Sequence, residues 1–160
     1  MFGGIWTLPL WQQHSPLQQL QLNATPDFWK DIKFFQKHTK KKELKPYFND
    51  GEFNSLDDAG KISCIPYINA IKNYIENSLI NLDGISDKYG RQPFLTYGWT
   101  IRKLRYAIDS NQGKSKGARL IFCINSNNLL FVYINIKKFC ADERKLENEF
   151  MTRIKNYILP

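Results

Sequence analysis

The sequence has few of the residues that usually mark a metal centre, a disulfide scaffold or a membrane span. Its 160 residues include three cysteines and two histidines, and no pair of cysteines has C-x-x-C spacing. An odd number of widely spaced cysteines supports neither a disulfide framework nor a zinc site. No apolar run approaches the length of about 18 residues that a membrane helix needs, and the start lacks the features of a signal peptide. We therefore expect a cytoplasmic chain without metal, cofactor or membrane contact.

Acidic residues are also scarce relative to basic ones. The chain has 23 Lys and Arg against 15 Asp and Glu, which gives a formal net charge of +8. It is 42% hydrophobic and 14% aromatic, enough to bury a core, and its length favours one domain. A basic, aromatic-rich chain favours an anionic partner, nucleic acid first and an acidic protein segment second. A net charge of this size can also serve solubility alone.

The composition changes along the chain. Residues 1–16 contain two tryptophans, two prolines and two glycines but no charged residue, so we interpret them as an irregular N-terminal extension. Residues 17–160 are interpreted as a single domain. Within it, the segment at about 40–91 is enlarged, and its first part holds the turn-forming residues Pro46, Asn49-Asp50-Gly51 and Asp57-Asp58.

Three helices are predicted from caps and apolar spacing. Thr25-Pro26-Asp27 is a helix start, so the first helix should run from Pro26 to about Thr39. Apolar residues three and four apart predict a second helix from about Pro66 to Leu82 and a third from about Ala141 to Leu159. A weak period-two alternation ends the stretch from Leu17 to Ala24 and predicts a strand there.

Three further strands are predicted in the second half of the chain. They span Phe94 to Ile108, Ala118 to Asn125 and Asn128 to Ile136, with a tight turn at Ser126-Asn127-Asn128, whereas Ile85 to Pro93 resembles a loop. Helices in one run and strands in another indicate an α+β domain. We expect a small twisted antiparallel sheet of three to four strands, with helices packed on one face and a C-terminal helix. The other face should be free.

The strand-like runs between Gly98 and Tyr133 contain cations. Alternate residues of a strand share a face, so Lys103 and Arg105 should be neighbours, and Arg119 should lie beside Arg105 across the hairpin. Forked and point cations of this kind suit phosphate oxygens. Between positions 98 and 119 there is one acidic residue, Asp109, and there are six basic ones: Arg102, Lys103, Arg105, Lys114, Lys116 and Arg119.

These residues resemble a known family. IRKLRYAI followed by GKSKGARLIF is similar to the central strands of the RelE/HigB-type toxins of type II toxin–antitoxin systems (RelE/ParE superfamily). LLFVYINIKK is similar to the family's third strand, with Tyr133 matching, and TPDFWKDI resembles its opening. The resemblance covers roughly Leu20 to Thr39 and Gly98 to Lys145. The family often has a lysine two residues after the tyrosine, where this chain has Asn135, and this chain is longer.

The resemblance implies an endoribonuclease that cleaves mRNA on the ribosome without a metal and so inhibits translation. In that chemistry the ribose 2′-hydroxyl attacks the adjacent phosphate. It implies that Arg105 and Arg119 stabilise the phosphate, and that Lys103 is the base if nearby cations depress its pKa. Tyr133 would stack on a base or orient the phosphate, and Lys138 or Lys137 would supply the acid. The residues expected to bind RNA are Arg102, Lys114, Lys116 and Lys137.

Alternatives stay open at this point. The same basic surface fits a non-catalytic protein that binds RNA or DNA, or one that mainly receives an acidic or amphipathic segment such as a cognate antitoxin. Tyr133 is also compatible with a core position, and Lys137 and Lys138 with a solvated strand end.

Overall fold

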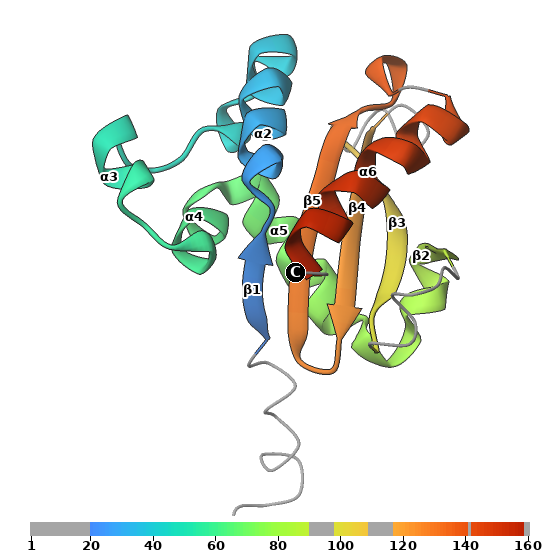
Figure 1. The fold of residues 1–160 in the computed structure, drawn as a ribbon. Helices are drawn as coiled ribbons and strands as arrows, with labels where there is room; N and C mark the ends of the chain where they lie inside the picture. The colour runs from blue at the N-terminus through green and yellow to red at the C-terminus, as the bar shows by residue number, and fades with distance from the viewer. Residues whose placement is uncertain (1–19, 90–97, 109–116, 141, 159–160) are drawn as a thin grey trace, which may run out of the picture.

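The computed structural model describes residues 20–89, 98–108, 117–140 and 142–158, which form a sheet with helices on both faces (Figure 1). The strands are β1 (Gln21–Ala24), β2 (Ser86–Tyr89), β3 (Thr100–Tyr106), β4 (Ala118–Asn125) and β5 (Asn128–Ile136). The α-helices are α2 (Pro26–Thr39), α3 (Asp50–Asn54), α4 (Asp58–Cys64), α5 (Pro66–Asn77) and α6 (Glu143–Ile158). The 3-10 turns are η3 (Lys42–Leu44), η4 (Leu79–Gly84) and η6 (Lys137–Phe139). Among these helices, none is long and apolar enough to span a bilayer.

The sheet confirms the predicted α+β class and has five strands, in the order β1-β5-β4-β3-β2. The three pairs from β2 to β5 are antiparallel, whereas β1 runs parallel to β5. The sequence predicts three to four strands because the short edge strand β2 lies in a segment that resembles a loop. Its residues Ser-Asp-Lys-Tyr carry little strand signal of their own, and pairing with β3 holds them extended.

Several predicted boundaries agree with the structure, and others do not. The bounds of α2, β4 and β5 are those predicted, while α5 ends at Asn77, where η4 takes over. The strand predicted to begin at Phe94 is described from Thr100, and residues 90–97 lie outside the described ranges. The turn-rich segment after α2 contains two short helices. Asn49 and Asp57 cap them by accepting hydrogen bonds from the backbone N–H groups three residues on.

The larger apolar layer lies between the sheet and helices α2, α4 and α5. Phe28 of α2 stacks on Phe131 of β5, with ring centroids 5.4 Å apart, and both are fully buried. Ile62 and Ile71 bring α4 and α5 onto the same layer. Burial of this many large side chains is the main source of the fold's stability.

A second apolar layer covers the opposite face, which the sequence leads us to expect free. Helix α6 crosses that face over β4 and β5, while α5 lies behind the sheet (Figure 1). Leu146, Phe150 and Ile154 of α6 are buried with Ile121 and Leu130 of the sheet. The expectation is wrong because all but the last residue of β4 are buried, and a strand buried on both faces needs cover on both.

An ion pair ties α6 to the rest of the fold. Arg153 of α6 donates to both carboxylate oxygens of Asp31 on α2, at 2.5 and 3.1 Å, and to the carbonyl of Val132 at 2.8 Å. The register of β4 and β5 shifts between Ile121 and Phe122, which leaves Val132 as the extra residue of a β-bulge. The Arg153 guanidinium therefore joins two helices and a strand at a single point.

Candidate nucleic-acid interface

The cations predicted to form the site gather at one end of the face that α6 covers. We call this group, Lys103, Arg105, Arg119 and Tyr133, the basic end. Arg105 of β3 is directly opposite Arg119 of β4, as expected, and Lys103 is opposite Ile121, which in turn pairs with Tyr133 of β5. Three neighbouring strands thus bring the four residues together.

A close approach of two backbones sets this register. Gly117 precedes β4, and a Cβ at this position would lie 2.1 Å from the carbonyl oxygen of Tyr106, well inside van der Waals contact. Only glycine permits the end of β3 and the start of β4 to come so near. The glycine of the Gly117-Ala118-Arg119 motif therefore has a direct physical role, which is to place Arg119 beside Arg105.

Lys103 is paired with an acid that sequence analysis does not single out. Its Nζ donates a hydrogen bond to Oε1 of Glu143, the first residue of α6, and the Tyr89 hydroxyl donates to Oε2 of Glu143 at 3.3 Å. The Lys103 side chain is 11% exposed, whereas that of Glu143 is 65% exposed. Glu143 therefore lies at the rim of the site and closes it over Lys103.

This pairing reverses the expected shift of the Lys103 pKa. Burial acts to lower it, but the hydrogen bond to Glu143 and the nearby Tyr89 outweigh burial, so the pKa of Lys103 is raised. The hydrogen bond from Lys103 in turn lowers the pKa of Glu143. The condition under which Lys103 would act as the base, a pKa depressed by neighbouring cations, is not met. At neutral pH the pair is an ammonium and a carboxylate.

The two arginines differ in exposure. Arg105 is exposed, and its Nη2 lies 3.9 Å from Oδ2 of Asp87 on β2. Arg119 is only 7% exposed, and its Nη1 donates to the carbonyl of Ala118 at 3.4 Å. Burial, and then the charge of Arg105, lower the pKa of Arg119. The proximity of two guanidinium groups creates a local preference for an anion.

Tyr133 lies in the core rather than on an open surface. It is 8% exposed, its ring centroid is 5.1 Å from the Arg153 guanidinium, and its hydroxyl accepts a hydrogen bond from Asn135 Nδ2 at 3.4 Å. Burial raises the pKa of Tyr133 to about 12, so the hydroxyl keeps its proton. Of the roles left open by the sequence, the core position is favoured and stacking on an RNA base is not.

The other predicted site residues, four RNA-binding residues and the proposed acid Lys138, are not part of the basic end. Arg102 points to the opposite face, where Nη1 donates to Asp83 at 2.9 Å and to Ser86 at 3.1 Å, and it is 8% exposed. It is buried away from the basic end, a position that does not favour its predicted RNA contact. Lys137 and Lys138 are exposed in η6, directly after β5. Lys114 and Lys116 lie outside the described residues.

Sequence analysis misses the acidic and aromatic partners of the site. Asp87 and Tyr89 lie in the segment predicted to be a loop. The sequence therefore gives no strand alternation from which to predict that they lie beside β3. Glu143 shows in the sequence only as an acid at a helix start, which suits the helix dipole. Its position over Lys103 depends on how α6 docks, and no local sequence pattern predicts that docking.

Neither a metal centre among the described residues nor a match to a known protein identifies the chemistry of the site. Among the described residues, no three His, Cys, Asp or Glu side chains group in a way that could hold a metal ion. Comparison of the chain with protein-family models, curated proteins and solved structures gives no match. The chemistry of the basic end must therefore be argued from its own residues.

Proposed function

We propose that this chain is an endoribonuclease of the RelE/HigB type, the toxin of a type II toxin–antitoxin system, and that it cleaves mRNA on the ribosome. The observation that supports this most is the convergence of Lys103, Arg105 and Arg119 at one end of one sheet face. Phosphoryl transfer needs little covalent help from the protein, so positioned cations are the main requirement. The motif that resembles the family and the geometry of the site involve the same residues.

The reaction is an internal transfer of the phosphate. The ribose O2′ bonds to the adjacent phosphorus, the bond from phosphorus to O5′ breaks, and the products carry a 2′,3′-cyclic phosphate and a 5′-hydroxyl. Negative charge builds on the non-bridging oxygens as the bond order changes. Arg105 and Arg119 would face those oxygens with charges that do not depend on pH, and such preplaced donors stabilise the transition state.

The proton transfers use the pair formed by Lys103 and Glu143. Because the pKa of Lys103 is raised, its ammonium suits the donation of a proton to the leaving O5′ better than the removal of one. The Glu143 carboxylate is ionised and would accept the proton from O2′. Its lowered pKa makes it a weak base, which predicts slow chemistry in the absence of further groups.

Glu143 also competes with RNA. Its carboxylate takes the position at Lys103 that a phosphate would take, and its side chain is 65% exposed, so it can turn away. RNA binding then exchanges one anion for another at the same ammonium. A cognate antitoxin could use the same surface with an acidic segment, and mRNA and antitoxin are the partners that this proposal implies.

Induced expression in a bacterial host tests the proposal. Wild type should slow growth and translation, and Arg105→Ala and Arg119→Ala should relieve both effects. Arg119→Lys keeps a positive charge at this buried position. It is the control for whether the loss of toxicity in Arg119→Ala comes from the missing charge or from misfolding. Lys33→Ala, which removes an exposed cation of α2, should behave as wild type. The proposal fails if wild type does not slow growth, or if Arg119→Ala slows it equally.

A non-catalytic protein that binds RNA or an antitoxin is the second candidate. The observation that favours it is that Lys103 is already paired and its pKa is raised rather than lowered. Under this alternative the basic end binds RNA with the same dependence on Arg105 and Arg119, but the RNA stays intact. The two candidates are therefore separated by the RNA product and not by affinity.

A further inference from the structure

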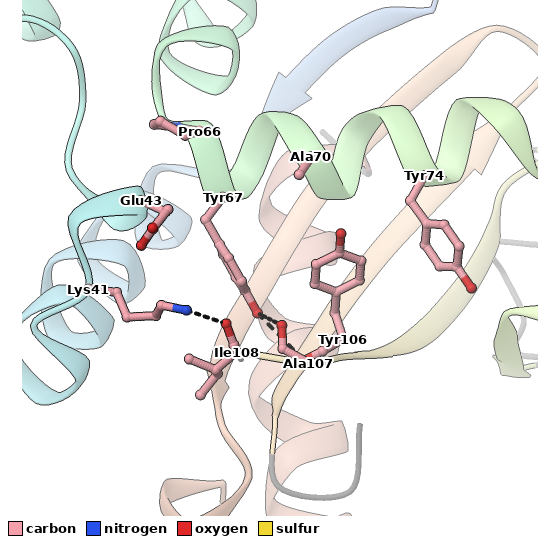
Figure 2. Close-up of a pocket in the computed structure, with 9 residues that line it drawn as sticks. All are labelled: Lys41, Glu43, Pro66, Tyr67, Ala70, Tyr74, Tyr106, Ala107 and Ile108. Carbon is pink, nitrogen blue, oxygen red and sulfur yellow. Dashed lines mark hydrogen bonds between the residues drawn. The ribbon is translucent and has the colours of Figure 1, made fainter. Parts of the chain in front are cut away.

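A pocket of about 590 Å³ lies on the other face of the sheet, beside the end of β3. Figure 2 shows the rings of Tyr67, Tyr106 and Tyr74 in a row along α5, with Lys41 and Glu43 near the Tyr67 side. Ala70 of α5 and the backbone around Ile108 complete the lining. A volume of this size is within the range of pockets that hold small molecules, roughly 300–1,000 Å³.

Hydrogen bonds fix the walls of this pocket. The Tyr67 hydroxyl donates to the carbonyl of Ala107 at 3.0 Å, and Lys41 Nζ donates to the carbonyl of Ile108 at 2.5 Å. The Tyr106 ring stands edge-on to Tyr67, with centroids 5.6 Å apart, and tilted to Tyr74, with centroids 5.7 Å apart. The three rings thus form a preorganised aromatic wall, since each contacts its neighbour.

The pocket and the basic end meet at the end of one strand. Arg105 and Tyr106 are consecutive residues of β3, so their side chains leave the sheet on opposite faces at the same level. Arg105 reaches the basic end, and Tyr106 lines the pocket.

We propose that this pocket binds a nucleobase, with its tyrosines providing the stacking surface. Aromatic rings bind planar bases of any sequence through stacking, at about 1–3 kcal/mol per base. Lys41 and Glu43 both line the pocket, and Lys40 and Lys42 flank Lys41 in sequence. The three lysines outnumber the one acid, so the local charge suits an anionic ligand such as a nucleotide over a neutral planar one. The choice of RNA as the source of the base rests on the proposed function. The base would belong to a nucleotide that flanks the one whose phosphate reaches Arg105.

Titration with the four ribonucleoside monophosphates tests this site without any RNA cleavage. At least one should bind saturably, and the corresponding uncharged nucleoside should bind as well, though more weakly. Ala70→Trp fills the pocket from an exposed position of α5 and should weaken binding at least tenfold. Asn73→Trp, an exposed position of the same helix that is not part of the lining, is the matched control and should change nothing.

A second variant covers the chance that tryptophan disturbs α5. Tyr74→Ala removes one half-buried ring and should weaken binding severalfold, with the far-ultraviolet circular dichroism unchanged. The site is refuted if no monophosphate binds, or if Ala70→Trp and Tyr74→Ala leave the affinity as it was. Lys33→Ala, which removes an exposed cation of α2 outside both sites, should leave monophosphate affinity unchanged. A toxin assay that fails while the pocket still binds nucleotide therefore refutes the proposed function and not the pocket.

Discussion

Both faces of the sheet are covered by apolar residues, but they differ in where their cations lie and in how those cations are paired. On the face of α2, α4 and α5, the buried cation Arg102 is matched by Asp83 and lies against η4. On the face of α6, one helix covers the middle of β4 and β5, and cations gather at the end where the helix begins. The first face mainly provides stability. The second divides its surface between an apolar layer and a charged end that can meet a ligand.

The stability of the first face should show most clearly at Phe28. This ring is fully buried and stacks on Phe131, so Phe28→Ala should lower the free energy of unfolding by about 3–5 kcal/mol. Phe34→Ala on the same helix, where the ring is 41% exposed, should cost under about 1 kcal/mol. Urea denaturation measures both. Equal losses would show that the face of α2 is not the dominant core.

Arg153 should be the next most costly position, because it joins the two faces. Arg153→Ala leaves Asp31 half-buried without its partner, and we expect a loss of about 3 kcal/mol. The pKa of Asp31 is raised, chiefly by burial and despite Arg153, so the variant should lose the most stability above the ordinary aspartate range. The double variant Asp31→Asn, Arg153→Met is the control and should be closer to wild type. A loss below 1 kcal/mol in the single variant would contradict the role of this ion pair.

Gly117→Ala should have a smaller effect on stability and a specific effect on the site. The added Cβ meets the Tyr106 carbonyl, so the strand ends must separate, at about 1–3 kcal/mol. Separation moves Arg119 away from Arg105, and RNA binding should fall more than stability predicts. Ala118→Gly, one residue further on, serves as a comparison that adds no atom. Unchanged RNA affinity in Gly117→Ala would contradict the role of this glycine in placing Arg119 beside Arg105.

Glu143→Gln should have the smallest effect on stability, and it should raise RNA affinity where Gly117→Ala lowers it. The pair with Lys103 is at the rim, and Glu143 is 65% exposed, so its loss should cost only a few tenths of a kcal/mol. Because the folded pKa of Glu143 is lowered, this contribution is present at neutral pH and lost as pH falls below the ordinary glutamate range. RNA affinity should rise severalfold in the variant, as measured by filter binding, while cleavage falls. Weaker RNA binding would refute the competition between Glu143 and phosphate.

The sequence predicts local features of this molecule well and the arrangement of distant elements poorly. Thr25-Pro26 and the Ser126-Asn127-Asn128 turn define α2 and the β4–β5 hairpin because their signals lie within a few residues. Alternation within β3 correctly separates Arg102 from Lys103 and Arg105. The docking of α6 depends on residues far away in the sequence. For this reason the sequence predicts neither the helix that covers the second face nor the pairing of Glu143 with Lys103.

One clue to the second layer was present in the sequence. The run Leu120-Ile121-Phe122-Cys123-Ile124 is apolar without alternation, which is typical of a strand buried on both faces. The wrong direction predicted for the pKa of Lys103 follows from overlooking this second layer. With a free face, nearby cations would dominate and lower that pKa, whereas the helix that covers the face brings a carboxylate that raises it.

The most direct test of the basic end is the chemistry of the RNA product. Purified wild-type protein is added to a reconstituted translation reaction, and the mRNA ends are mapped and their phosphates identified. We predict cuts within translated mRNA that leave a 2′,3′-cyclic phosphate and a 5′-hydroxyl, absent with Arg119→Ala and retained with Lys33→Ala. Intact mRNA with wild type, or the same cuts with Arg119→Ala, would contradict it.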